Sequence, residues 1–229
     1  MWLLHSSIGR KFVMSITGIA LVLFLLFHLS MNVAAVFSAD AYNMICAFLG
    51  ANWYAVVATI ILGALVFIHI AYSMMITLQN RKARGNDRYA VNRRPKGVSW
   101  ASQNMFVLGT IVCGFLLLHF GQFWYKMMFA ELRGHHEVML SGNMISPQDG
   151  YAFICYYFSR LWVVIAYLVW YVALWFHLTH GFWSALQTIG FNNHVWFNRL
   201  KWIGNVVATV LMLGFMFVTI IFYVKSQLI

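Results

Sequence analysis

Four long apolar stretches of the sequence each carry a histidine near membrane mid-depth: His28, His69, His119 and His180. An ionisable side chain inside hydrocarbon is costly, so it usually marks a functional site. One such histidine could simply hydrogen-bond a neighbouring helix, but one on each of four helices is much harder to explain that way. Four neutral imidazoles can ligate two haem irons from both sides, and bis-histidine haems suit electron transfer. The pattern predicts a two-haem b-type cytochrome that carries electrons across a membrane.

The composition predicts helices that could hold these histidines. Of 229 residues, 62% are hydrophobic and 9% are charged, which no soluble domain of this size would tolerate. Five runs contain no Asp, Glu, Lys or Arg: residues 12–39, 41–80, 97–125, 161–198 and 202–224. A span needs roughly 20 apolar residues. We therefore expect a single all-α haem-binding bundle over residues 1–229, with transmembrane helices near 12–37, 53–78, 105–125, 158–188 and 204–224.

The net charge of +10 follows the expected topology rather than nucleic-acid binding. Seven of the 15 basic residues fall between the second and third helices: Arg81, Lys82, Arg84, Arg88, Arg93, Arg94 and Lys96. Positive charge beside a span marks the cytoplasmic side. Arg10, Lys11, Arg199 and Lys201 fall on that same side. The sequence therefore predicts a cytoplasmic N-terminus, and a basic face that a soluble partner or lipid headgroups could contact.

The same topology sorts the histidines by depth. At 1.5 Å per residue, His28 and His119 lie about 25 and 22 Å from the inner side. His69 and His180 lie about 18 and 15 Å from it. The expected pairs are therefore His28 with His119 for an outer haem, and His69 with His180 for an inner haem.

Helix four offers a second candidate ligand, His177. It lies three residues before His180, so the two point within about 60° of one another. We expect His180 to be the ligand because it matches the depth of His69 and has Gly181 beside it. His177 would then hydrogen-bond a propionate or another helix. Three glycines could let a flat porphyrin approach the backbone, with close helix packing as the alternative: Gly63, Gly114 and Gly181.

One long connection, residues 126–157, lies on the outer side and contains three glycines and a proline. We expect an irregular loop with a short interfacial helix, and a length that is typical of binding segments. The three cysteines are isolated, without the C-x-x-C-H of covalent haem attachment, so we expect free thiols: Cys46, Cys113 and Cys155.

Several stretches resemble the cytochrome b subunit of succinate dehydrogenase/fumarate reductase, in its single-subunit, two-haem form. They are His5-Ser-Ser-Ile-Gly-Arg-Lys11, Thr17-Gly18, Phe27-His28-Leu29 with Asn32, and His177-Leu-Thr-His180-Gly181-Phe-Trp-Ser184-Ala-Leu-Gln187. The resemblance covers the whole chain, including the ligand-bearing helices and the basic loop.

The resemblance implies a distal haem b on His28 and His119 and a proximal haem b on His69 and His180. It also implies two soluble partners on the cytoplasmic side, a flavoprotein with covalent FAD and an iron-sulfur subunit, which perform the dicarboxylate chemistry. This chain would be the quinone-reactive part of that enzyme complex. It would exchange electrons with menaquinone or menaquinol in the bacterial cytoplasmic membrane, contacting lipid and no nucleic acid. A dimer of the heterotrimer is compatible with this reading.

The sequence departs from the family at its acids. Some fumarate reductases carry a glutamate near the outer end of helix two, and another two residues before the helix-four ligand; the latter position is Leu178 here. Candidates for the outer quinone site are Asp40, His135, His136 and Glu137. Candidates for an inner propionate or quinone contact are Ser7, Arg10 and His177. The alternative for each of these residues is a solvated position at a helix end. Both directions of electron flow, succinate oxidation and fumarate reduction, stay open.

Three other functions are compatible with parts of this pattern. One is the cytochrome b anchor of another quinone-linked reductase, although such anchors tend to concentrate their ligands on fewer helices. Another is a transporter or channel without haem whose intramembrane histidines relay protons. The last is a purely structural anchor, whose haem could be lost without loss of activity towards quinone.

The pairing by depth makes a direct prediction for His119→Ala. We expect this variant to lose the outer haem and keep the inner one, because only one of the two irons loses a ligand. Haem quantitation and a reduced-minus-oxidised spectrum of the purified protein measure this. Retention of both haems would refute the pairing.

Overall fold

Five helices are long and apolar enough to cross a membrane in the part of the chain that the structure describes. The computed structural model describes residues 6–84, 99–191, 193 and 195–228. The five are α2 (Ser7–Phe37), α4 (Trp53–Arg84), α6 (Met105–His119) with its π-helical continuation η1 (Phe120–Trp124), α9 (Leu161–Thr188) and α10 (Trp196–Leu228). The predicted all-α class, with five helices of membrane-spanning length, is confirmed. The largest difference from the predicted limits is that α10 begins at Trp196 rather than near residue 204.

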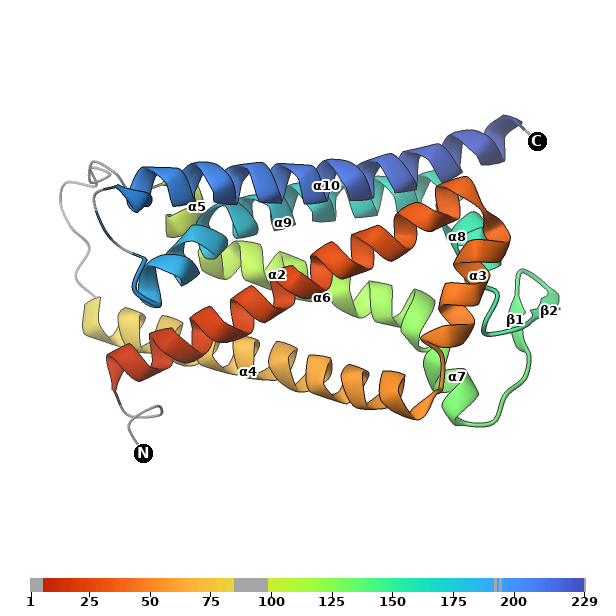
Figure 1. The fold of residues 1–229 in the computed structure, drawn as a ribbon, viewed down its shortest axis with the longest axis horizontal. Helices are drawn as coiled ribbons and strands as arrows, with labels where there is room; N and C mark the ends of the chain where they lie inside the picture. The colour runs from red at the N-terminus through yellow and green to blue at the C-terminus, as the bar shows by residue number, and fades with distance from the viewer. Residues whose placement is uncertain (1–5, 85–98, 192, 194, 229) are drawn as a thin grey trace.

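The bundle has two chemically different ends (Figure 1). The end that we call the basic end holds the start of α2, the end of α4, the short α5 (Trp100–Gln103), the end of α9 and the start of α10. The described basic residues there include Arg10, Lys11, Arg81, Lys82, Arg199 and Lys201. The other end, the hairpin end, holds α3, α7, α8 and a β-hairpin. Other residues named above lie outside the described residues: His5, Arg88, Arg93, Arg94 and Lys96.

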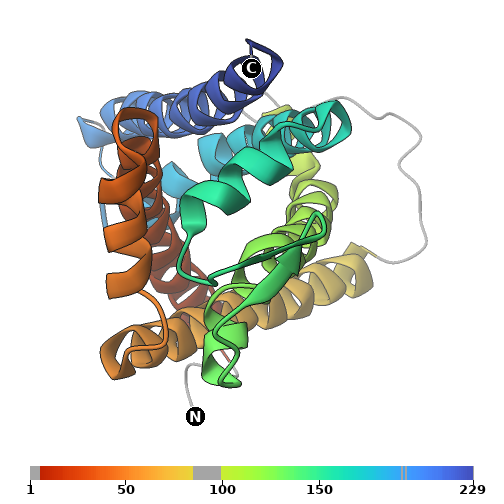
Figure 2. The same cartoon turned by 90° about the vertical axis from the view of Figure 1, so that its right-hand side faces the viewer.

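Helix α9 is the hub of the bundle. It packs against α2, α6 and α10, while α2 also contacts α4 and α10. Helices α10 and α4 lie on opposite sides of the assembly (Figure 2). In the most apolar window of α9, 44% of residues are buried, against 6% for α4. Helix α4 therefore packs mainly on α2 and leaves most of its surface uncovered by the described protein.

Serine caps set the first helix boundaries. The Ser6 hydroxyl accepts a hydrogen bond from Gly9 N at 2.9 Å, which satisfies a free amide of the first turn of α2. Ser38 is extended and separates α2 from α3 (Ala39–Phe48), and its hydroxyl accepts from Ala41 N at 3.1 Å. Helix α3 was not predicted, because most of it lies in the charge-free run 41–80 that also holds most of α4.

The long outer connection is more ordered than predicted. It contains α7 (Met128–Leu132), a hairpin of β1 (Val138–Leu140) and β2 (Asn143–Ile145), and α8 (Gly150–Phe158). Leu140 pairs with Asn143 across a two-residue turn, Ser141-Gly142, whose φ angles are 56° and 85°. Positive φ at both turn residues matches the twist of a hairpin. The expectation of an irregular loop with one short helix was therefore wrong for residues 138–145.

Gly150 permits the close approach of α8 to α3. A Cβ added at Gly150 would collide with Cys46 Sγ and come within 3.0 Å of the Tyr42 ring. Neither neighbour is the end of a long flexible side chain, so neither can move away cheaply.

We expect Gly150→Ala to lower the free energy of unfolding by about 1–3 kcal/mol, because it overpacks this contact. Gly121→Ala is the matched control, since a Cβ there meets no atom within 4 Å. Thermal unfolding followed by circular dichroism in detergent compares the two. Equal melting temperatures would show that α8 does not depend on this contact.

Candidate functional site

The structure brings His28 of α2 and His119 of α6 together. Their ring centres lie 5.9 Å apart, with the ring planes at 87°. Phe24, Phe215, Phe123 and Trp170 surround them with aromatic surface. This is the outer pair that depth along the helices predicted, located toward the hairpin end of the bundle.

The second pair consists of His69 of α4 and His177 of α9. Their ring centres lie 6.4 Å apart, with the planes at 61°. The His180 ring instead packs edge-on against Trp183, with 5.3 Å between the ring centres. Lys201 Nζ lies 4.8 Å from the ring centre of Trp183. The helix-four ring in contact with His69 is thus that of His177. The assignment of His180 as the ligand stays a prediction.

Both distances suit two imidazoles on opposite sides of one iron. A metal–imidazole bond of about 2 Å, with the ring centre about 1.1 Å behind the nitrogen, separates two such rings by about 6.2 Å between centres. The observed values of 5.9 and 6.4 Å bracket this spacing. Perpendicular planes are compatible with it, because each ring can turn about its own metal–nitrogen bond.

The protein offers only two ligands at each position. Among the described residues, no group of three or more His, Cys, Asp or Glu could hold a bare metal ion. A bis-histidine haem needs two imidazoles from the protein, because the porphyrin nitrogens supply the other four bonds. The donor set therefore fits haem and does not fit a structural zinc site.

Three glycines on the ligand-bearing helices have open space where a Cβ would lie. A Cβ added at Gly63, Gly114 or Gly181 would meet no atom within 4 Å, so the alternative of close helix packing does not hold for these three glycines. By contrast, a Cβ at Gly18 would lie 3.4 Å from the His69 ring, and one at Gly109 would lie 3.7 Å from the His177 ring. A Cβ at either position would make an ordinary van der Waals contact, so Gly18 and Gly109 lie against the inner pair of imidazoles without being required by them.

Hydroxyl groups hold one ring of each pair. His69 Nδ1 lies 3.1 Å from Thr17 Oγ1, and Thr17 is itself buried. His119 Nδ1 lies 3.1 Å from the hydroxyl of Tyr167 on α9, and that hydroxyl donates to Gln122 Oε1 at 2.7 Å. Sequence reasoning missed Tyr167 and Gln122, because nothing in their spacing singles them out among many aromatic and apolar neighbours.

The opposite rings have different surroundings. The side-chain amide of Asn32 lies 3.4 Å from His28 Nε2 and donates to the His28 carbonyl at 2.8 Å. Asn32 Oδ1 in turn accepts from Tyr42 OH at 3.3 Å. The Nδ1 atoms of His177 and His180 are buried without a hydrogen-bond partner in the described part of the chain. Such orphaned nitrogens are costly in an apolar interior and indicate a missing partner.

The residues predicted for the outer quinone site are not gathered. Asp40 is exposed in the first turn of α3, and His135, His136 and Glu137 are exposed just before β1. No side-chain hydrogen bond joins these four to one another or to the histidine pairs among the described residues. At the basic end, Ser7 is exposed in the first turn of α2, and Arg10 is half-buried one turn further on.

Two other acids organise the hairpin end. Asp149 Oδ1 accepts from Ala152 N at 3.1 Å, which caps α8, and from Asn43 Nδ2 at 2.8 Å. Glu131 Oε2 accepts from Ala51 N and from Gln148 Nε2, each at 3.2 Å. These bonds tie the outer connection to α3 and to the start of α4. An N-cap pattern at Asp149 could have been read from the sequence, but nothing there points to Glu131.

The three cysteines are free, as predicted. Burial raises the pKa of the Cys46 thiol in α3 to about 11, with the nearby Asp149 and Glu131 carboxylates adding to the effect. The thiol therefore stays protonated at neutral pH and is a poor nucleophile or metal ligand.

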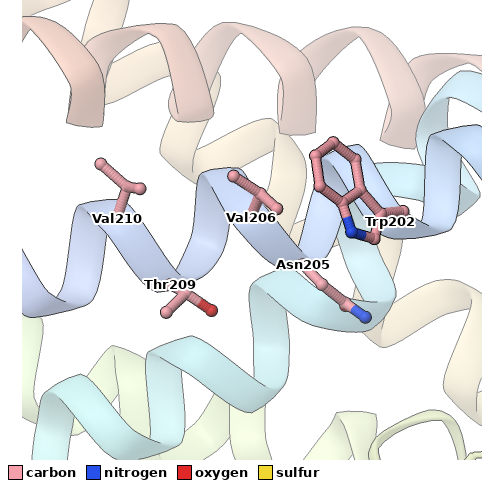
Figure 3. Close-up of a pocket in the computed structure, with 5 residues that line it drawn as sticks. All are labelled: Trp202, Asn205, Val206, Thr209 and Val210. Atoms are coloured by element: carbon pink, nitrogen blue, oxygen red, sulfur yellow. The ribbon is translucent and has the colours of Figure 1, made fainter.

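A surface hollow of about 240 Å³ on α10 is not the candidate site (Figure 3). Its lining residues all come from that one helix: Trp202, Asn205, Val206, Thr209 and Val210. None of them titrates near neutral pH, and Thr209 is already engaged by Trp175 Nε1 at 3.0 Å. The hollow has no chemistry comparable with the histidine pairs.

Comparison with models of protein families, with curated proteins and with solved structures finds no match to this chain.

The geometry predicts different outcomes for the two histidines of α9. We expect His177→Ala to lose one haem of two, and His180→Ala to keep both, because only His177 faces His69. Pyridine-haemochrome quantitation on both purified variants measures this. Loss of a haem in His180→Ala alone would restore His180 as the ligand.

Proposed function

We propose that this chain is the two-haem cytochrome b anchor of a succinate:quinone or quinol:fumarate oxidoreductase. The observation that carries the proposal is the presence of two facing imidazole pairs, at 5.9 and 6.4 Å, on four helices of membrane-spanning length. The family resemblance of the sequence motifs supports the choice among quinone-linked cytochromes.

In this proposal the outer haem is held by His28 and His119, and the inner haem by His69 and His177. His177 takes the place that the sequence had suggested for His180. A haem iron with two axial imidazoles supplies one-electron transfer and has no open position for oxygen. The His28 ring would turn away from Asn32 to present Nε2 to the iron, because a nitrogen that accepts a hydrogen bond cannot also bind a metal.

The residues at the basic end suit the carboxylate arms of the inner haem. His180 lies one turn from His177 and has a buried nitrogen without a partner among the described residues. Lys201 lies over the face of Trp183, which also packs on His180. A donor and a cation at this depth would stabilise a propionate, and Ser7 and Arg10 remain further candidates from α2.

The proposal places the basic end in the cytoplasm, facing an iron-sulfur subunit and its flavoprotein partner. The excess of lysine and arginine at this end supports that orientation. Menaquinone or menaquinol would react near the hairpin end, close to the outer haem. One electron crossing the membrane exchanges about 2.3 kcal/mol per 100 mV of potential, so the two directions of flow have opposite energetic consequences.

The first test is a haem count on the purified chain with its co-purifying partners. We expect a reduced-minus-oxidised b-type spectrum and two haems per chain by pyridine haemochrome, because the two histidine pairs supply four axial ligands. One haem would break the assignment of one pair. No haem would favour a transporter whose histidines relay protons. Two haems without flavin or iron-sulfur partners would favour another quinone-linked anchor.

A further inference from the structure

Two hydroxyl groups beside the histidine pairs donate their protons to acceptors other than the histidines. Thr17 Oγ1 donates to Val13 O at 2.8 Å, one turn earlier in α2. Tyr167 OH donates to Gln122 Oε1 at 2.7 Å, and both side chains are buried, at 2% and 6% exposure. A hydroxyl has one proton and two acceptor lone pairs. Toward any further neighbour, each oxygen can therefore only accept.

That further neighbour is in each case a histidine Nδ1. Thr17 Oγ1 lies 3.1 Å from His69 Nδ1, and Tyr167 OH lies 3.1 Å from His119 Nδ1. Since the oxygens must accept, each Nδ1 carries the proton. A neutral imidazole has one protonated nitrogen, so Nε2 is left with a free lone pair. Both hydroxyls thus select the tautomer that binds metal through Nε2.

We propose that Thr17 and Tyr167 are positioning residues, each of which fixes one haem ligand and sets the reduction potential of one haem. This inference depends on the proposed function, because it requires iron between the histidines. It goes further in assigning Thr17 to the inner haem, and Tyr167 with Gln122 to the outer haem.

Each iron would then have one anchored ligand and one less constrained ligand. The ring opposite His69 is His177, whose Nδ1 has no partner among the described residues. The ring opposite His119 is His28, whose polar neighbour is the donor amide of Asn32 rather than an acceptor. In the part of the chain that the structure describes, the side-chain hydroxyl contacts of these rings lie on one side of each pair, at His69 and at His119.

The hydrogen-bonded chain from His119 through Tyr167 to Gln122 depends on the π-helical turn that follows His119. Tyr125 N bonds Phe120 O at 2.8 Å, a five-residue step that widens the helix locally. Gln122 lies within this turn, buried on the side where Tyr167 of α9 reaches it. The donation from Tyr167 to Gln122 polarises the hydroxyl and makes its oxygen a better acceptor for His119.

The electronic consequence has a definite sign. A hydrogen bond accepted from Nδ1–H increases the electron density of the imidazole and makes it a stronger donor to iron. A stronger donor stabilises the ferric state more than the ferrous state, which lowers the reduction potential. Removing either hydroxyl should therefore raise the potential of the haem that it serves, and only of that haem.

The test is a crossed pair of variants, Tyr167→Phe and Thr17→Val, in the complete complex. Redox titration of the α-band absorbance gives both potentials, and electron paramagnetic resonance separates the two ferric signals. The signal that disappears in His119→Ala identifies the outer haem. We expect each variant to raise the reduction equilibrium constant of its own haem about tenfold, or about 59 mV for one electron.

Tyr171→Phe is the matched control. Tyr171 lies one turn further along α9 and is equally buried, but its hydroxyl bonds Thr219 Oγ1 at 3.0 Å instead of a histidine. We expect it to leave both potentials unchanged. Gln122→Met is a second, milder test that keeps Tyr167 and should shift the outer haem alone, in the same direction.

The outcomes separate the two levels of the proposal. A wild-type complex without haem would contradict the proposed function itself. Two haems whose potentials stay fixed in Tyr167→Phe and Thr17→Val, or move as much in Tyr171→Phe, would overturn the positioning role alone. Selective loss of the outer haem from Tyr167→Phe, with both retained in Tyr171→Phe, would support the role as an anchor of His119.

Discussion

The cost of placing polar groups in hydrocarbon constrains the whole molecule. A bilayer core contains no water to satisfy a stray donor or acceptor, so each polar side chain within a span needs a partner from the protein or from a bound group. Thr17 meets this need through Val13 O of its own helix, and Thr219 meets it through Tyr171 of α9. His177 and His180 do not, since each has a buried nitrogen without a partner among the described residues. Among the described residues, these nitrogens are unpaired polar atoms inside the bundle, as is Trp170 Nε1.

Helix α9 brings the polar side chains of the bundle together. It contacts α2, α6 and α10, and it contributes both His177 and the hydroxyl of Tyr167. Helix α4 makes few such contacts and is nearly bare within its most apolar window. Its His69 nevertheless faces α9 at a distance suited to a shared iron. A haem at this position would act as the packing partner that α4 lacks, which makes cofactor binding and helix assembly a single event.

Composition predicted the long helices, whereas contacts that depend on how each helix is rotated about its axis could not be read from the sequence. Charge-free runs identified the five long helices, and distance along them grouped His28 with His119. Depth alone could not choose between His177 and His180, because residues three apart differ by less than one turn in height and by about 60° in direction. Only the packing of α9 fixes that angle. The β-hairpin escaped because its strands have three residues each, and the Ser141-Gly142 turn is a weak signal. Glu131 and Gln122 act through contacts between segments remote in sequence.

The two histidine pairs draw on different helices, α2 with α6 and α4 with α9. Each has its own hydroxyl neighbour, aliphatic in Thr17 and phenolic in Tyr167. Identical axial ligands would give two haems similar potentials, so any difference must come from surroundings such as these. A difference matters because an electron that moves between the pairs also moves through the membrane potential, at about 2.3 kcal/mol per 100 mV for the full crossing. The difference between the two reduction potentials could offset the free energy of moving the electron through the membrane potential. The electron would then have a similar free energy at both haems. In the proposed two-haem chain, the hydroxyl beside each pair would therefore contribute to whether electrons pass in both directions or favour one.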